Sequence, residues 1–129
     1  MHNPPLILIA DDEPDFREIL AAKLKQEGYW VAEAKDGQEV VEKAVALKPD
    51  LVVMDINMPN ENGTEAVLDI RENKETKDTK IVFLSNLKNP WPGLKDTHPV
   101  AAKELGAADF IDKSGDLKEA VAKIKKLLS

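Results

Sequence analysis

The 129-residue sequence contains no cysteine and only two histidines, His2 and His98. Without cysteine the chain cannot form disulfides, thiolate metal sites or a cysteine nucleophile. The two histidines lie far apart in the sequence, which disfavours a histidine-based metal site and a Ser-His-Asp triad. Oxygen ligands are therefore the candidates for any metal site in this protein.

Long apolar runs and an excess of basic residues are also missing. The longest apolar runs have about five residues, whereas a membrane-spanning helix needs about 20. Asp and Glu number 24 against 18 Lys and Arg, a formal net charge of −6, which argues against direct binding of nucleic acid. An apolar content of 43% and a charged content of 33% are typical of a globular chain. We expect one cytoplasmic domain over residues 1–129, without a leader peptide or membrane segment.

Short apolar runs alternate with helical periods along the whole chain. Strands are predicted over residues 6–10, 29–34, 51–54, 81–84 and 108–111. Helices are predicted over residues 14–27, 36–48, 64–71, 99–105 and 117–128. The apolar positions expected to form the buried face of the first helix are Phe16, Ile19, Leu20 and Leu24.

This alternation predicts an α/β fold, a three-layer doubly wound (βα)5 sandwich around a parallel five-stranded sheet. The runs at residues 6–10 and 51–54 are apolar throughout, as expected for strands that are covered on both faces. The run at residues 29–34 is more mixed, which suggests an edge strand.

Polar residues follow four of the five predicted strands, and ligands of such sheets bind outside the carboxyl ends of the strands. The residues in question are Asp11, Asp12 and Glu13 after the first strand, Asp55 after the third, Ser85 and Asn86 after the fourth, and Lys113 after the fifth. Three clustered carboxylates repel one another unless a cation compensates them, and an oxygen-only ligand set suits Mg²⁺ or Mn²⁺. A lysine and a hydroxyl at the same edge could hold a phosphoryl group, with the central carboxylate as nucleophile.

Each of these residues also has a simpler structural interpretation. Asp11, Asp12 and Glu13 could cap the helix that begins at Pro14, where the helix dipole favours negative charge. Asp55 could be an ordinary turn residue, and a lysine after a strand is commonly solvated. Polar residues after four separate strands nevertheless favour a site over four coincidences.

The motifs closely resemble the receiver domain of two-component response regulators, over about residues 6–128. The resemblance rests on Asp11, Asp12 and Glu13, on Asp-x-x-Met-Pro-x-x-x-Gly from Asp55 to Gly63, on Ser85, and on Phe-Ile-Asp-Lys ending at Lys113. It implies the sheet order 2-1-3-4-5 and a phosphoryl donor that is a histidine kinase or a histidine phosphotransfer protein.

The resemblance also implies a role for individual residues. Asp55 is the expected phosphoryl acceptor, and Lys113 is the expected contact of the phosphoryl group. Mg²⁺ is expected to bind Asp12 and Asp55 directly, Asp11 through water, and the backbone carbonyl of Asn57. Ser85 and Phe110 stand at the two switch positions, which are expected to move together on phosphorylation.

The sequence departs from the family pattern at three places. Ser114 follows Lys113 where the family usually has a proline in a cis peptide, and Asn86 follows Ser85 where a small residue is usual. The stretch between Ser85 and Phe110 is longer than in compact chemotaxis-type receivers, with the extra residues around Trp91 in the loop 86–98.

That loop could dock a partner through Trp91, since tryptophan is favoured at binding hot spots. A surface insertion with Trp91 packed back onto the domain is the interpretation we favour.

The resemblance implies a phosphorylation-controlled switch rather than an enzyme. Phosphorylation is expected to alter the surface of the last two βα units, which a downstream protein or a second copy of the chain would recognise. A pseudo-receiver that binds proteins without being phosphorylated is the first alternative. The second is a Mg²⁺-dependent aspartyl phosphohydrolase, which needs an aspartate as general acid at the position of Asn57, and asparagine cannot supply that proton.

Overall fold

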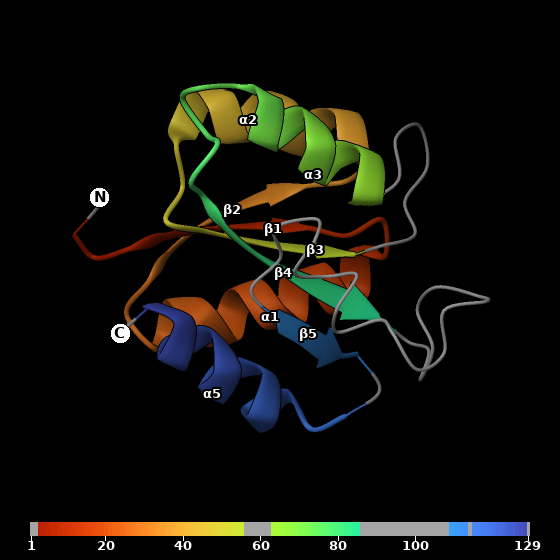
Figure 1. The fold of residues 1–129 in the computed structure, drawn as a ribbon. Helices are drawn as coiled ribbons and strands as arrows, with labels where there is room; N and C mark the ends of the chain where they lie inside the picture. Colours follow the sequence, from red (N-terminus) through yellow and green to blue (C-terminus); the bar gives the residue numbers. More distant parts are fainter. Residues whose placement is uncertain (1–2, 56–62, 86–108, 114, 129) are drawn as a thin grey trace.

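The computed structural model describes residues 3–55, 63–85, 109–113 and 115–128 (Figure 1). Of residues 63, 64, 85, 109 and 110 it gives the backbone alone. The elements in chain order are β1 (Leu6–Ala10), α1 (Pro14–Gln26), β2 (Trp30–Ala34), α2 (Gly37–Leu47), β3 (Leu51–Asp55), α3 (Gly63–Glu72), β4 (Lys80–Ser85), β5 (Asp109–Asp112) and α5 (Leu117–Leu128). The predicted helix over residues 99–105 and the loop over residues 86–98 lie outside the described residues.

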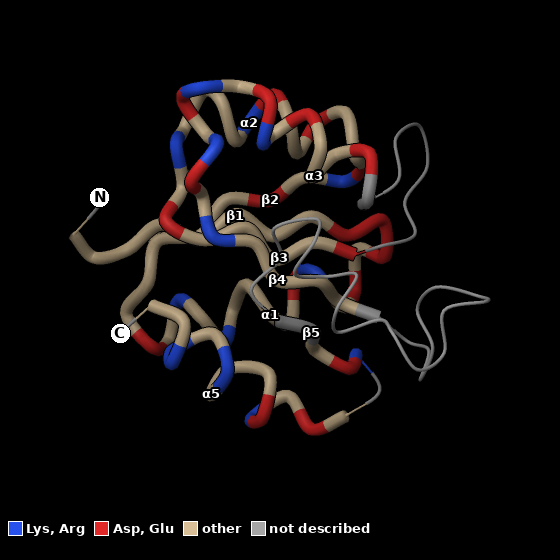
Figure 2. Tube along the Cα trace, viewed as in Figure 1, with Lys and Arg blue, Asp and Glu red and all other residues tan. Residues whose placement is uncertain are grey.

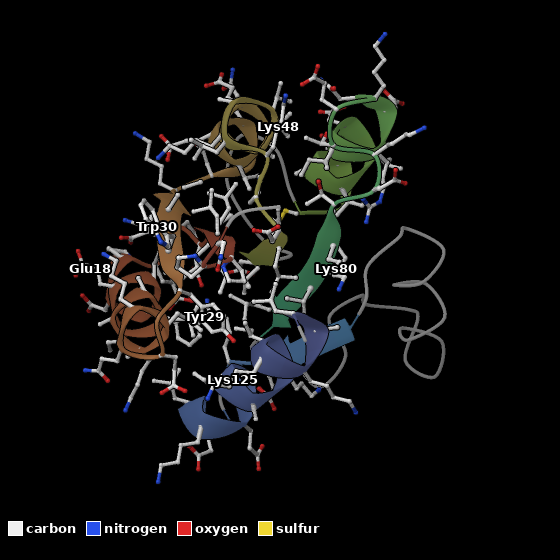
Figure 3. All side chains as sticks on the ribbon, turned by 90° about the vertical axis from the view of Figure 1, so that its left-hand side faces the viewer. Glu18, Tyr29, Trp30, Lys48, Lys80 and Lys125 are labelled. Carbon is white, nitrogen blue, oxygen red and sulfur yellow. The ribbon has the colours of Figure 1, made fainter. Side chains whose placement is uncertain are left out.

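The five strands form one parallel sheet in the order β2-β1-β3-β4-β5, which confirms the predicted fold and strand order. Figure 1 shows α2 and α3 on one face of the sheet and α1 and α5 on the other. The mixed strand β2 is an edge strand, as predicted, and Trp30 at its start exposes 63% of its surface (Figure 3).

The core is divided into two layers by the sheet. Alternate residues of a strand point to opposite faces, so Leu8 and Ala10 of β1 pack toward α2 and α3, while Ile7 and Ile9 pack toward α1 and α5. Every residue of β1 and of β3 is buried. This double coverage explains why both strands are apolar throughout up to the aspartate that ends β3.

Local signals set the ends of the helices near the predicted positions. Gly28 adopts a positive φ of 96° just after α1, and its N–H donates to the carbonyl of Lys25. Asp36 caps α2 by accepting a hydrogen bond from the N–H of Glu39 at 2.8 Å. At the start of β4, the Lys80 ammonium donates to the Leu127 carbonyl in the last turn of α5 at 2.6 Å. Lys80 is labelled in Figure 3.

One expectation about the buried face of α1 was wrong, and element ends differ slightly from the predicted ranges. Ile19 was expected on the buried face of α1, but 55% of its surface is exposed, whereas Leu20 and Leu24 are fully buried. Successive helix residues are rotated by about 100°, so Ile19 points away from the sheet that Leu20 faces. Several strand ends differ from the predicted ranges by one residue; β3, for example, includes Asp55, which pairs in register with Leu84 of β4.

None of the helices in the described residues is long and apolar enough to cross a membrane. This agrees with the short apolar runs of the sequence.

Phe83 and Ile19 provide a test of which apolar side chains form the core. Phe83 is fully buried under α2 and α3, so Phe83→Ala should lower the free energy of unfolding by about 3–5 kcal/mol because it leaves a cavity. Ile19→Ala should lower it by less than about 1 kcal/mol, since Ile19 is mostly solvated. Urea unfolding followed by circular dichroism measures both values. Equal losses for the two variants would contradict this placement of the core.

Candidate functional site

The carboxyl edge of the sheet carries a cluster of three aspartates. Asp11 and Asp12 follow β1, and Asp55 ends the neighbouring strand β3. One carboxylate oxygen from each of the three lies within 4.8 Å of the others. Asp11 and Asp55 are buried, whereas Asp12 is exposed to solvent. The acidic residues at the ends of β1 and β3 gather at this edge in Figure 2.

Three hydrogen bonds hold Asp11 in place. Its N–H donates to the Ala34 carbonyl of β2 at 3.0 Å, and its carbonyl accepts a hydrogen bond from Nη1 of Arg17 at 2.7 Å. Its Oδ1 accepts from the N–H of Glu13 at 2.9 Å. These bonds fix the direction of the Asp11 carboxylate before any ligand arrives.

The simpler interpretation of the acidic run as a helix cap does not describe the structure. The N-cap residue of α1 is Glu13, and its side chain makes no capping hydrogen bond. Pro14 in the first turn of α1 has no N–H to be capped. The side chain of Glu13 is instead directed to the ammonium group of Lys113.

Lys113 follows β5 and inserts its ammonium among the carboxylates. Nζ lies 2.7 Å from Oδ2 of Asp11 and 3.1 Å from Oδ2 of Asp55, and it also contacts Oε1 of Glu13. The Lys113 side chain is only 2% exposed. The centroid of the Phe16 ring lies 4.8 Å from Nζ, close enough for a cation–π contact. Lys113 thus meets carboxylates that lie 58 to 102 positions before it in the sequence.

The surroundings keep Lys113 protonated. Burial on its own lowers the pKa of a lysine, but close contacts with the carboxylates of Asp11 and Glu13 and the negative charges of Asp55 and Asp11 outweigh it. The pKa of Lys113 therefore lies above its ordinary value. At neutral pH this edge of the sheet carries a fixed positive charge beside Asp55.

The cluster fits a hard divalent cation. Its ligand atoms are all carboxylate oxygens, and Asp12 is open to solvent, which leaves room for water ligands. Oδ2 of Asp11 is buried and, within the described part of the chain, receives no hydrogen bond of regular geometry, its contact being the ion pair with Lys113. One lysine does not balance three aspartates and Glu13, so a further positive charge would be favourable here.

The remaining residues expected at the site are covered only in part. The backbone of Ser85 ends β4 at the same edge and pairs with Asp112 of β5, while Phe110 pairs with Phe83 inside the sheet. Asn57, like Asn86, Trp91 and Ser114, lies outside the described residues. The roles expected for Ser85, Phe110 and Asn57 therefore stay predictions.

The sequence reasoning missed two neighbours of the cluster. Arg17 donates to the Asp11 carbonyl and, through Nε, to Oε1 of Glu33 on β2 at 3.0 Å. Phe16 was expected only as a core residue, yet its ring faces the ammonium of Lys113. Arg17 lies one helical turn after Glu13, and that spacing was the only signal of its proximity to the acidic run.

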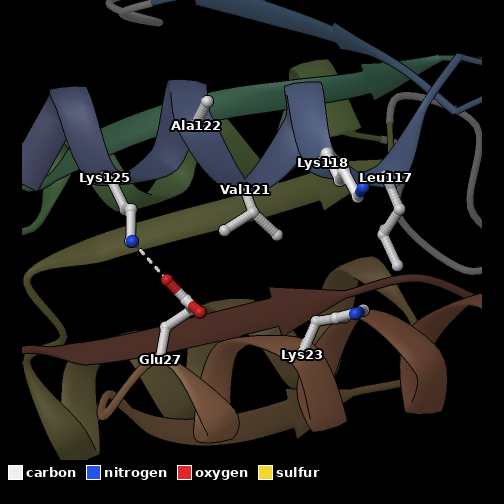
Figure 4. A pocket seen from close by; sticks show the side chains of 7 residues that line it. All are labelled: Lys23, Glu27, Leu117, Lys118, Val121, Ala122 and Lys125. Atoms are coloured by element: carbon white, nitrogen blue, oxygen red, sulfur yellow. Dashed lines mark ion pairs between the residues drawn. The ribbon is translucent and has the colours of Figure 1, made fainter.

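A separate hollow of about 310 Å³ lies between α1 and α5 (Figure 4). Leu117, Val121 and Ala122 of α5 contribute to its lining, and Figure 4 shows Leu117 and Val121 directed toward α1. Glu27, also in the lining, forms an ion pair with Lys125. The hollow is also lined by Lys23 and Lys118. A single carboxylate among three lysines does not suit a divalent cation, unlike the cluster of Asp11, Asp12 and Asp55.

Comparison with known sequences places the whole described fold in one family. Residues 7–125 match the model of the response regulator receiver domain. Response regulator RR06 of Streptococcus pneumoniae is 38% identical over 122 residues, which cover 95% of this chain and 52% of that protein. The phosphate regulon transcriptional regulatory protein PhoB of Pseudomonas aeruginosa is 34% identical over 95% of this chain and 51% of its own length. The chain thus spans about half the length of these two relatives.

Solved structures agree with this assignment. Chemotaxis protein CheY4 of Vibrio cholerae matches with a TM-score of 0.84 at 25% identity, over 95% of this chain and 98% of that one. Response regulator TrrA of Thermotoga maritima, solved in complex with Mg²⁺-BeF, matches with a TM-score of 0.79 at 35% identity, over 95% and 98% of the two chains. The chain therefore belongs to the response regulator receiver domain family, a family of regulatory domains of two-component systems.

Proposed function

We propose that this receiver domain is a switch controlled by phosphorylation of Asp55. The observation that carries the proposal is the arrangement at the edge of the sheet, where the carboxylates of Asp11, Asp12 and Asp55 lie within 4.8 Å and the buried ammonium of Lys113 contacts Asp55. An acidic cluster of this kind in a receiver domain is consistent with phosphorylation-controlled signalling.

The metal partner in this proposal is Mg²⁺, or Mn²⁺ in its place. Asp12 and Asp55 would bind it directly and Asp11 through water, together with the backbone carbonyl of Asn57. The complex of TrrA with Mg²⁺-BeF supports this, because TrrA is 35% identical to the present chain over nearly its whole length. When bound, the ion supplies positive charge that offsets the carboxylates and the charge of the transferred group.

The residues of the chain supply the rest of the chemistry. A carboxylate oxygen of Asp55 attacks the phosphorus of a phosphohistidine, so a P–O bond forms, the P–N bond breaks, and the leaving imidazole nitrogen takes the electron pair and then a proton from water. Lys113, which is protonated and already beside Asp55, pairs with an oxygen of the new acyl phosphate. The hydroxyl of Ser85 donates a hydrogen bond to another oxygen.

The output is a change of surface. Phosphorylation adds negative charge where β3, β4 and β5 end, and Ser85 and Phe110 on β4 and β5 are the groups proposed to follow it. The resulting change at β4, β5 and α5 would be recognised by a downstream protein or by a second copy of the chain. The proposed donor is a histidine kinase or a histidine phosphotransfer protein, as expected for a two-component receiver.

Phosphorylation of Asp55 can be tested by intact mass after incubation with Mg²⁺ and acetyl phosphate. The wild type should gain the mass of one phosphoryl group, and Asp55→Ala should gain none because it lacks the attacking oxygen. Asp69→Ala, which removes an exposed aspartate from α3, is the matched control and should be labelled like the wild type. If the wild type binds Mg²⁺ yet stays unlabelled, or if Asp55→Ala is labelled equally, the proposed acceptor is wrong. A protein that neither binds metal nor gains mass would be a pseudo-receiver.

Metal binding can be tested by thermal unfolding with and without Mg²⁺. A ligand that binds only the folded state adds about 2.7 kcal/mol to the free energy of unfolding at 100 times its Kd, so the wild-type Tm should rise with added Mg²⁺. Asp12→Ala should lose most of that rise, because the variant lacks the solvent-facing ligand. Asp69→Ala should keep it. An Asp12→Ala protein with a wild-type response to Mg²⁺ would mean that the ion binds elsewhere.

A further inference from the structure

The ammonium group of Lys113 is surrounded by carboxylates. It carries three N–H bonds, and three carboxylate oxygens surround it: Oδ2 of Asp11, Oδ2 of Asp55 and Oε1 of Glu13. The ring of Phe16 covers a further side. An oxygen of a phosphoryl group must therefore compete with these carboxylates for the Lys113 ammonium.

The three carboxylates differ in what it costs to release them. The side chain of Asp11 is fully buried and that of Asp55 is 10% exposed, whereas that of Glu13 is 54% exposed. A buried carboxylate that loses its ion partner is left without compensation, which is costly. An exposed carboxylate is rehydrated on release, so breaking its ion pair costs little. Asp55 is the residue that bonds to the incoming group, and of the two other partners Glu13 is the one that the incoming anion would displace.

The side chain of Glu13 has no part in starting α1. The backbone of Glu13 is held by its own N–H, which donates to Oδ1 of Asp11, and by its carbonyl, which accepts from the N–H of Arg17 at 3.1 Å. The carboxylate makes no capping hydrogen bond. A substitution that neutralises this side chain therefore leaves the backbone bonds at the start of the helix in place.

We infer that Glu13 is a positioning residue that restrains Lys113 and thereby weakens the binding of a phosphoryl group at Asp55. The inference rests on the proposed function, because it takes Lys113 as the contact of that group. Before phosphorylation, Glu13 forms an ion pair with the ammonium of Lys113. The phosphoryl group displaces the Glu13 carboxylate into water. The affinity of the site for this group is therefore lowered, because the ion pair between Glu13 and Lys113 must first be broken.

The affinity for beryllium fluoride, a non-covalent mimic of a phosphoryl group, tests the inference directly. We would titrate it into the full chain at saturating Mg²⁺ and follow the bound fluoride by fluorine NMR. Glu13→Gln should bind it about two- to fivefold more tightly than the wild type, the range expected for loss of a partly exposed ion pair. The glutamine keeps the size of the side chain but not its charge.

Asp15→Asn is the matched control, because it removes one negative charge two residues away. Asp15 lies in the first turn of α1, is exposed, and is not among the carboxylates that contact Lys113. Its variant should bind beryllium fluoride about as tightly as the wild type. Equal tightening in both variants would mean that charge alone acts, and unchanged or weaker binding by Glu13→Gln would also overturn the inference. Failure of the wild type itself to bind beryllium fluoride would instead refute the proposed function.

Discussion

The buried ion pairs of Lys113 are the interaction around which this edge of the domain is organised. Asp11 and Asp55 are both buried, and two carboxylates in such an environment are stable as anions only beside a positive charge. Lys113 supplies that charge from the end of β5 and so ties the last strand to β1 and β3 at the centre of the sheet. The same contacts keep the lysine protonated, ready for a group that brings more negative charge.

The order of the strands makes this meeting of residues possible. In the order β2-β1-β3-β4-β5 the neighbours β1 and β3 carry aspartates at their carboxyl ends, Asp11 and Asp12 directly after β1 and Asp55 as the last residue of β3. The edge strand β5 brings the lysine to the same side. The core on both faces fixes the strands in place, because Ile9 and Val53 pack toward α1 and α5 while Ala10 and Met54 pack toward α2 and α3. A shift of one residue in either central strand would turn its side chains to the wrong face and move its aspartate. The site therefore depends on packing throughout the sheet.

The sequence predicted the strands and most helix ends because each has a local cause. Apolar runs, Gly28 after α1 and Asp36 before α2 act within a few residues of themselves, and the structure follows them closely. The error at Ile19 has a different origin. Whether a residue on the flank of a helical face is covered depends on which other helix lies beside it, and that is decided by the tertiary fold.

The sequence by itself determined the fold class and the set of polar residues at the carboxyl edge, since strand ends in a parallel sheet share one side. Only the tertiary structure decided how those residues pair. It buries Lys113 among Asp11, Asp55 and Glu13, brings Phe16 against the ammonium, and joins Arg17 to both Asp11 and Glu33. Such contacts link residues that are distant in the chain and depend on distances of a few ångströms, which composition and spacing do not specify.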